Sequence, residues 1–482
     1  MQSKLEHLAA LRKLGINPYP YRYERTKVNA EFREKYAALN PGDLLEDVVA
    51  ICGRVMAKRG FGKLFFLDVH DHTGKLQVMA TADKTPQQTL DLLALVDVGD
   101  FVGAKGKAHR TVKGELSVLL GELTMLSKSL EPLPEKWSGL QDVEDRHRKR
   151  HLDLVMNPGV RALFANRSKI ISLVRAFLEQ QGFLEVEIPT LQPVYGGANA
   201  RPFLTKSNAW KSNFYLSISP ELYLKRLLIG GYDRVYTICK NFRNEDVDKT
   251  HNPEFTMMEC YACYWDYSDQ MSLTERLFEY VALQLNGTTR ITYEGKDIDL
   301  KAPWQRLTLY DALKKYANID VSELTDDDLK RLLKEHQVEV VPFKRGLAIA
   351  ELFSKTVEDK LIQPVFIIDH PKETTPLCKA KRGNADLIER FEPFINGWEV
   401  ANAYSELNDA VLQEKVFQEQ ADQGTAKGEN HPIDMDYVEA MRYGMPPAAG
   451  LGIGIDRMVM LLTGAKTIRE VLLFPQMKPL KP

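Results

Sequence analysis

The stretch Asn241–Tyr261, NFRNEDVDKTHNPEFTMMECY, decides how the rest of this chain is interpreted. A polar loop in it separates two segments with the composition of strands, Arg234–Asn241 and Phe255–Tyr261. Side chains alternate between the two faces of a strand, so Glu259 shares a face with aromatic side chains. A strand that is buried only for packing would not turn a carboxylate inward. The stretch therefore predicts the floor of a binding site for a charged, flat and phosphorylated ligand.

Length and composition limit the possible classes of protein. The 482 residues exceed one ordinary core, so two or three domains are expected. The net charge of −2 argues neither for nor against a nucleic-acid partner. Five cysteines do not indicate a disulfide framework, and the lone CxxC at Cys260 and Cys263 is not interpreted as a zinc site. No apolar run approaches the roughly 20 residues that span a bilayer, so a cytoplasmic protein without a membrane partner is expected.

The N-terminal part of the chain changes pattern twice. Residues 1–45 have a helical, charged pattern, whereas residues 46–132 consist of short β-rich runs that glycines interrupt. About five such runs with one helical insert, Pro86–Val96, predict a small closed barrel of the OB-fold type. Residues 133–156 form a linker. Its basic cluster, Arg146–His151, is interpreted as a solvated helix face in preference to a nucleic-acid contact.

Residues 157–482 have the pattern of one mixed domain. Asn157-Pro158 is a helix start, because Asn caps helices and Pro is tolerated at their first position. The segment Phe183–Ile188 alternates like a strand and ends at Pro189. A helix-rich insertion at about 308–360 interrupts the later strands. The predicted class is α+β: the N-terminal barrel is followed along the chain by a domain with an antiparallel sheet flanked by helices.

A predicted hairpin in the segment FEPFINGWEV carries two carboxylates. Asn396-Gly397 between apolar runs indicates a type I′ turn. Such a turn places Glu399 opposite Phe394 and makes Glu392 its diagonal neighbour, about 7–8 Å away. Two carboxylates at this distance repel each other unless a cation joins them, so a Mg²⁺ site is favoured over a solvated edge pair. Further along, Asn402, Tyr404 and Glu406 would face the side of a straight strand opposite to Glu399. Either a bulge brings the two groups to one face, or they serve different parts of one site.

Two further segments have unusual composition. Ala449–Leu462, AGLGIGIDRMVMLL, contains alternate glycines that allow a ligand or a neighbouring backbone to approach closely. Arg457 in this segment follows Asp456 at a helix start, and the alternatives are a structural ion pair between them and a ligand contact. Glu221 lies in the first turn of a predicted helix, where stabilisation of the helix end is its simplest role.

These segments, in this order, resemble the class II aminoacyl-tRNA synthetases. The helix and strand that end at Pro189 are similar to motif 1, the dimer element of that family. Phe242–Glu245, its loop and Phe255 are similar to motif 2, and the glycines with Arg457 are similar to motif 3. The preceding OB-type domain is similar to that of the subclass for Lys, Asp and Asn. Within this subclass, SPELYLKR, HNPEFTMMECY, EVANAYSELND and GLGIGIDRMVMLL resemble the lysyl-tRNA synthetases.

The resemblance implies an ATP-dependent ligase that forms lysyl-adenylate and transfers lysine to the terminal adenosine of tRNA(Lys). It implies Mg²⁺ as the cofactor, ATP and L-lysine as substrates, and a homodimer formed through motif 1. The implied catalytic residues are Arg243 and Arg457, and the implied metal ligands are Glu392 and Glu399. The implied ATP-binding residues are Arg243, Glu245, His251, Asn252, Phe255, Glu392, Glu399 and Arg457.

The resemblance also implies two sets of recognition residues. The lysine-binding set is Gly197, Glu221, Arg243, Glu259, Tyr261, Asn402, Tyr404 and Glu406, with Glu406 and Tyr261 on the ε-ammonium. The anticodon-binding set in the barrel is Arg59, Phe66, Gln77 and Glu115. Only the resemblance directs Phe66 outward, since one of the adjacent residues Phe65 and Phe66 must face the core. Thr250 and the alanines beside Asn402 depart from residues common in the family, and Thr250 leaves the acceptor-stem contacts open.

Three other functions compete with this interpretation. An aspartyl- or asparaginyl-tRNA synthetase would need cations facing the substrate side chain, but Glu221, Glu259 and Glu406 predict an acidic pocket. A ligase that attaches lysine to a protein resembles the catalytic domain alone, without the barrel. A non-catalytic nucleic-acid-binding paralogue would not need to retain Arg243 and Arg457.

Overall fold

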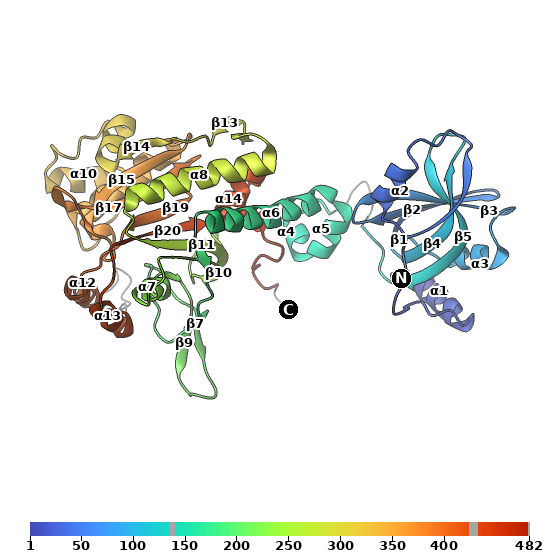
Figure 1. Ribbon diagram of the computed structural model, residues 1–482, viewed down its shortest axis with the longest axis horizontal. Coiled ribbons are helices and arrows are strands. Elements are labelled where there is room, and N and C mark those ends of the chain that lie inside the picture. Colours follow the sequence, from blue (N-terminus) through green and yellow to red (C-terminus); the bar gives the residue numbers. More distant parts are fainter. Residues whose placement is uncertain (135–139, 424–431, 481–482) are drawn as a thin grey trace. The chain divides into compact units, whose positions relative to one another are not determined.

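The computed structural model describes residues 1–134, 140–423 and 432–480 (Figure 1). The chain divides into two compact units, Met1–Gln141 and Asp142–Pro482. The first contains the expected barrel, and the second contains a large mixed sheet with helices, which confirms the α+β class. None of the helices in the described residues is long and apolar enough to cross a membrane. All five cysteines have free thiols.

The first unit is a closed barrel with the strand order β1-β2-β3-β5-β4. All neighbouring strands are antiparallel except β3 and β5, which are parallel. Val49, Ile51, Leu67 and Val118 are buried in its interior, as the apolar alternation along each strand requires. The strands are β1 (Leu44–Phe61), β2 (Leu64–Asp71), β3 (Gly74–Thr81), β4 (Phe101–Arg110) and β5 (Leu116–Ser127), with helix α3 (Gln87–Ala94) between β3 and β4.

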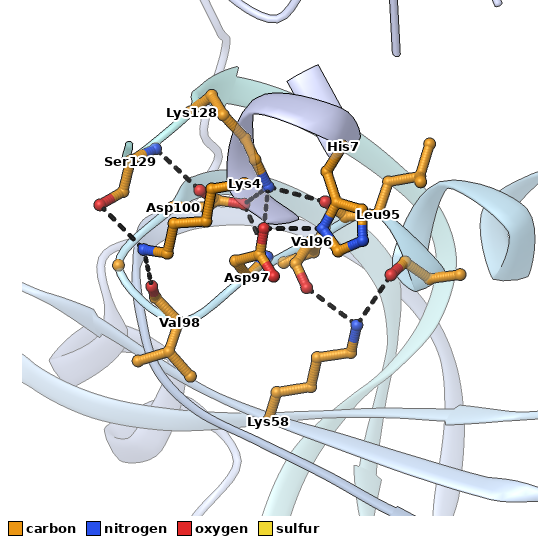
Figure 2. A network of polar contacts seen from close by, with 12 residues as sticks. Lys4, His7, Lys58, Leu95, Val96, Asp97, Val98, Asp100, Lys128 and Ser129 are labelled. Carbon is orange, nitrogen blue, oxygen red and sulfur yellow. Dashed lines mark hydrogen bonds and ion pairs between the residues drawn. The ribbon is translucent and has the colours of Figure 1, made fainter. Parts of the chain in front are cut away.

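Helices α1 (Gln2–Lys13) and α2 (Asn29–Lys35) precede the barrel. Figure 2 shows the polar network that holds α1 against it. Lys128 is fully buried, with its Nζ 2.6 Å from Asp97 and 2.7 Å from Asp100. His7 Nδ1 lies 2.8 Å from Asp97, and Lys4 Nζ donates to the carbonyl of Val98 at 3.0 Å. Burial alone would raise the pKa of Asp97, but Lys128 and His7 outweigh it and lower that pKa.

The second unit is built on a ten-stranded sheet with the main order β14-β15-β17-β19-β20-β11-β10-β6. The outer pairs β14–β15 and β10–β6 are parallel, and the pairs between them are antiparallel. The bounds are β6 (Leu184–Glu185), β10 (Arg234–Phe242), β11 (Glu254–Cys263), β14 (Gln305–Thr308), β15 (Val365–Pro371), β17 (Asn384–Ile395), β19 (Ala401–Ser405) and β20 (Ala448–Gly454), with β16 (Ala380–Lys381) and β18 (Trp398–Glu399) beside β17.

The two faces of this sheet have different environments. Met258, Cys260 and Ala262 of β11 belong to the core under α6 (Pro158–Gln180) and α8 (Tyr267–Asn286), which lie along one face (Figure 1). The alternate residues of β11, including Glu259, point to the other face, as the period of the strand requires. Near that face lie α7 (Glu221–Ile229), α12 (Ala410–Gln423), α13 (Met435–Arg442) and the small sheet of β7 (Leu191–Gln192), β8 (Leu204–Lys206) and β9 (Asn213–Leu216).

The region 308–360 contains the helices α9 (Leu309–Ala312), α10 (Asp326–Glu335) and α11 (Arg345–Thr356), with a π-helical turn η1 (Leu313–Ala317) and a 3₁₀ turn η2 (Glu358–Lys360). Thr325 caps α10 by accepting a hydrogen bond from the backbone of Asp328 at 3.2 Å. The remaining elements are β12 (Arg290–Tyr293), β13 (Lys296–Asp299), η3 (Lys372–Thr374), α14 (Ile455–Thr463) and η4 (Ile468–Val471).

The basic cluster Arg146–His151 folds into α4 (Val143–Arg148) and α5 (Arg150–Met156). Arg150 is 2% exposed and donates to the backbone carbonyls of Arg469, Leu472 and Leu473. Burial, followed by neighbouring arginines, lowers the pKa of His147 to about 4. The interpretation as a solvated helix face is therefore wrong for Arg150 and His147, which are both buried, and Arg150 binds the C-terminal segment.

Candidate active site

The hairpin between β17 and β18 has the predicted turn. Asn396 and Gly397 have φ values of 54° and 77°, and Glu399 pairs with Phe394. Phe391 then pairs with Ala403, one residue out of step with the hairpin register. One extra residue within 400–402 therefore forms a bulge and reverses the parity. The bulge brings Asn402, Tyr404, Glu392 and Glu399 to one side of the sheet, which decides between the two arrangements that the sequence leaves open.

Two joined cavities of about 440 and 190 Å³ lie over this face. Arg243, Met257, Glu399, Asn402 and Gly452 line both of them. The larger cavity also contains the predicted residues Gly197, Glu221, Glu259, Tyr261, Glu392 and Tyr404. The smaller cavity contains the predicted residues Glu245, His251, Asn252, Phe255 and Arg457. The structure thus brings together every predicted ATP- and lysine-binding residue except Glu406, which lines neither cavity.

Arg243 lies at the junction of the two cavities, just beyond the end of β10. Its guanidinium carbon is 5.1 Å from the centre of the Phe255 ring, and its buried Nε has no hydrogen-bond partner among the described residues. Burial lowers the pKa of Arg243, while Glu399 and Glu245 act in the opposite direction. An unpartnered guanidinium fork is suited to carboxylate and phosphate oxygens, which match its geometry.

Arg457 faces the smaller cavity from the first turn of α14. Its Nη2 is 3.1 Å from His251 Nε2, and its Nη1 is 3.6 Å from the carboxylate of Glu399. Asp456 does not form the ion pair with Arg457 that the sequence left open. It binds Arg167 of α6 at 2.6 Å and accepts from the backbone of Thr256 at 2.7 Å. Asp456 therefore joins three elements, and Arg457 also donates a hydrogen bond to the backbone carbonyl of Glu399.

The two predicted metal ligands differ in their surroundings. Glu392 forms an ion pair with Arg390, and the carboxylate of Glu399 lies 3.6 Å from Arg457, so arginines already offset part of the repulsion from which the metal site was predicted. Burial, followed by the charge of Glu392, raises the pKa of Glu399. Within the described parts of the chain, no group of three or more His, Cys, Asp or Glu is arranged to hold a metal. Two coupled carboxylates fit an ion that completes its shell with phosphate oxygens and water, as Mg²⁺ does.

The inner end of the larger cavity is acidic. Glu221, Glu259 and Glu406 are 4%, 5% and 0% exposed. Glu259 accepts hydrogen bonds from Ser219 Oγ and the Tyr261 hydroxyl, both at 3.0 Å, and the Tyr404 hydroxyl donates to Glu221 at 2.7 Å. Burial, followed by the charge of Glu221, raises the pKa of Glu259 to about 8. Buried carboxylates at such density require cationic partners.

Glu406 lies directly behind this cavity and is bound by Lys225 of α7. A Cβ at Gly450 would collide with both the Glu406 carboxylate and the Tyr261 ring. Glycine is therefore required at this position of β20. The close approach also places Glu406 against two residues that line the cavity, Gly450 and Tyr261.

In the first unit, the four predicted anticodon-binding residues come from adjacent strands. Phe65 packs against the barrel core, which leaves Phe66 on the opposite face, as expected from alternation. Arg59 is the cross-strand partner of Phe66, and Gln77 pairs with Asp68 two residues further along. Glu115 is exposed at the start of β5, and Ser117 joins it to Gln77 by hydrogen bonds of 3.2 and 3.0 Å.

Two charged residues, Arg390 and Lys225, contact predicted site residues but were not themselves predicted from the sequence. Arg390 binds Asn402 at 2.9 Å as well as Glu392, and therefore connects the amino-acid and metal parts of the site. Its alternation with Glu392 along one strand was the available signal. Lys225 stands four residues after Glu221, a spacing that brings two side chains together on a helix.

Comparisons with known proteins agree with this geometry. Residues 142–478 match the family of class II tRNA synthetases (D, K and N), and residues 49–131 match the OB-fold nucleic acid binding domain. The chain is 47% identical to lysine–tRNA ligase 2 of Methanosarcina mazei, over 99% of this chain and 94% of that protein. It is also 47% identical to the lysine–tRNA ligases of Moorella thermoacetica and Carboxydothermus hydrogenoformans, over 99% of this chain and 98% and 97% of theirs. The chain belongs to the class II tRNA synthetases, in the lysine–tRNA ligase family.

Proposed function

We propose that this protein activates L-lysine with ATP and transfers it to the terminal adenosine of tRNA(Lys). The observation that carries the proposal is a group of three buried carboxyl groups, of which Glu221 and Glu259 line the same cavity as Arg243 and Glu406 lies behind it. L-Lysine has the complementary pattern, with two ammonium groups and one carboxylate. A neutral or acidic competitor would leave a buried carboxylate without a cation, which is costly.

Lysine enters the larger cavity with its carboxylate toward Arg243 and Asn402. Gly197, Glu221 and Glu259 surround its α-ammonium group. Its alkyl chain packs along Tyr404, and its ε-ammonium points toward Tyr261 and Glu406. In this pose each charged group of the substrate has a partner. The distance from Arg243 to Glu406 then selects for the length of the amino-acid side chain.

ATP occupies the smaller cavity. Phe255 and Arg457 contact opposite faces of the adenine, since a ring and a guanidinium both stack on aromatic surfaces. Glu245 and Asn252 orient the adenosine, and His251 lies toward the β- and γ-phosphates. Glu392 and Glu399 hold Mg²⁺, which supplies positive charge to the phosphate oxygens when it is bound.

The chemistry then requires positioning and charge neutralisation. The lysine carboxylate attacks the α-phosphorus, pyrophosphate leaves, and lysyl-adenylate forms without an enzyme nucleophile. Arg243 touches both reactants in this pose and neutralises charge at the reacting phosphorus. In the second step a hydroxyl of the terminal adenosine attacks the lysyl carbonyl, and AMP leaves.

The test of this proposal is amino-acid-dependent ATP–pyrophosphate exchange with the purified protein, without tRNA, across all the standard amino acids. Exchange with lysine alone is the expected result. Exchange with aspartate or asparagine would keep the family and overturn the specificity. Absence of exchange with every amino acid would favour a non-catalytic paralogue.

We expect Phe66→Ala to raise the KM for tRNA(Lys) in aminoacylation and to leave exchange unchanged. The exposed face with Arg59 and Phe66 suits single-stranded bases, which stack on aromatic rings at about 1–3 kcal/mol per base. An expected rise of roughly tenfold corresponds to the lower part of this range. Impaired exchange would contradict the assignment of this face to the anticodon, and Tyr19→Ala, at an exposed tyrosine before β1, is the control.

We expect lysine binding to release a proton at about pH 7. The raised pKa of Glu259, about 8, keeps this carboxyl mostly protonated in the empty pocket, and the substrate ammonium favours its charged form. Affinity should therefore rise by up to about tenfold per pH unit below pH 8 and level off above it. Calorimetric titrations in buffers of different ionisation enthalpy measure the release directly. Buffer-independent enthalpies would contradict this prediction, and Glu259→Gln should abolish the release.

The homodimer expected for the family rests on α6 and the strand that follows it. Sedimentation of the full chain across a concentration series measures the dimer directly, and a monomer at micromolar concentration would contradict it.

A further inference from the structure

Lys225 is the most deeply buried cation near the lysine-binding end of the site. Its side chain is fully buried on α7, with Nζ 2.5 Å from Glu221 Oε1 and in an ion pair with Glu406. The rings of Tyr404 and Tyr437 lie 5.5 and 6.0 Å from the same ammonium. This single group therefore contacts one carboxylate that lines the cavity and one that lies behind it.

The charged and titratable groups around Lys225 come from five parts of the fold. They are Glu221 of α7, Glu259 and Tyr261 of β11, Tyr404 of β19 with Glu406 just after it, Cys378 beside Glu406, and Tyr437 of α13. Lys225 is the one cation among these groups, against three carboxyl groups, and burial raises the pKa of two of them, Glu259 and Glu406. L-Lysine would bring two further ammonium groups to this cluster.

Lys225 also contacts Glu406, which lies behind the cavity. Glu406 approaches Gly450 and Tyr261 on the cavity side and Lys225 on the side away from it. Its two carboxylate oxygens are buried and have no other hydrogen-bond partner in the described residues. Burial raises the pKa of Glu406 well above its usual range, and Lys225 is the neighbouring group that acts most strongly in the opposite direction.

We propose that Lys225 is a positioning residue for lysine recognition, whose ammonium holds the carboxyl groups of Glu406 and Glu221 in place for the substrate. The inference rests on the proposed function and extends it to a residue that does not line the cavity. The competing explanation is an ion pair that only stabilises α7 against β19. Buried ion pairs contribute little net stability on average, so a structural role alone does not explain this arrangement well.

The test compares Lys225→Met and Lys225→Gln with the unmodified protein in lysine-dependent ATP–pyrophosphate exchange. Both variants remove the charge at nearly constant length, and Gln keeps a polar end. We expect the KM for lysine to rise at least tenfold in both, with the KM for ATP within twofold of normal. The acidic limb of kcat/KM for lysine should move to higher pH by a unit or more, because loss of a neighbouring cation raises carboxyl pKa values.

The control is Lys128→Met in the barrel. Lys128 is equally buried and pairs with two carboxylates, so this variant reproduces the loss of a buried ion pair elsewhere in the chain. It should lower thermal stability without changing the KM for lysine.

Each outcome decides between the two explanations. An unchanged KM for lysine with an unmoved acidic limb would overturn the role of Lys225, and so would equal losses for lysine and ATP. Failure of both variants to fold would assign Lys225 to stability alone. If the unmodified protein showed no lysine-dependent exchange, the proposed function itself would be refuted. That result is distinct from one in which the unmodified protein is active and the Lys225 variants behave like it.

Discussion

Replacing Arg243 by alanine is expected to reduce lysine-dependent ATP–pyrophosphate exchange by about a thousandfold. Loss of one preorganised donor at a developing charge typically costs 10²–10³-fold. For Arg243 we expect a loss at the upper end of this range, because Arg243 lines both cavities and its Nε has no hydrogen-bond partner among the described residues. We therefore expect this guanidinium to bind the reacting ligands. The loss should appear mainly in kcat, since the interaction strengthens as charge develops.

The variant Arg243→Lys tests whether the positive charge of Arg243 is sufficient or whether its planar shape is also required. It keeps a cation but loses the planar fork, so we expect it to recover only part of the lost rate. Arg276→Ala is the control, because Arg276 is exposed on α8 and donates only to Ser272 and Gln181 among described residues. It should exchange at the normal rate. A loss below tenfold for Arg243→Ala would contradict the central position of this guanidinium.

Local patterns in the sequence were sufficient to predict the hairpin and its carboxylates. Asn396-Gly397 adopts the positive φ values that its composition favours, and the pairing of Glu399 with Phe394 follows from the two-residue turn. Helix α6 begins at the predicted proline. These features depend on contacts between residues close in the chain, which is why sequence composition determines them.

The bulge after the hairpin depends on the neighbouring strand. β19 pairs with β20 over its whole length, with Asn402 opposite Gly452 and Tyr404 opposite Gly450. That pairing, between residues about 50 positions apart, imposes a register one step away from that of the hairpin. The sequence of the hairpin alone leaves both alternatives open, since the extra residue carries no distinctive side chain.

The partner of a buried charge was the hardest feature to predict. Asp456 is adjacent to Arg457 in the chain but binds Arg167, 289 residues away. Glu392 is paired with Arg390, so a count of nearby charges on one strand would have corrected the assumption that it is unpaired. Burial makes such partners obligatory, but only the packed fold shows which cation supplies the charge.

The strand expected at Phe183–Ile188 is shorter than its apolar alternation suggests. β6 comprises only Leu184–Glu185, because it pairs with β10 at two positions, Val235 and Tyr236. The alternation also does not match the burial here, because Leu184 is exposed whereas Phe183 is buried. Strand length depends on the neighbouring backbone, which local alternation does not describe. The same distinction explains why the barrel was easier to predict, since each of its strands has paired neighbours on both sides.

Glu406→Gln is expected to reduce kcat/KM for lysine in exchange by more than tenfold, with the KM for ATP little changed. The substitution preserves size but removes the carboxyl group that faces the substrate ε-ammonium in the proposed pose, behind Tyr261 and Gly450. It also leaves Lys225 with Glu221 alone, so a buried ammonium loses half of its partners. A tenfold loss corresponds to about 1.4 kcal/mol.

A loss for lysine without a loss for ATP distinguishes a role of Glu406 in lysine recognition from a general loss of structure. Glu406 lines neither cavity, so its effect must pass through Tyr261 and Gly450 to the larger one and should not reach the ATP site. Glu144→Gln, at an exposed glutamate of α4 that pairs with Arg148, is the control and should leave both KM values unchanged. Equal losses for lysine and ATP in Glu406→Gln would show that this carboxylate maintains the fold of the floor instead of selecting the amino acid.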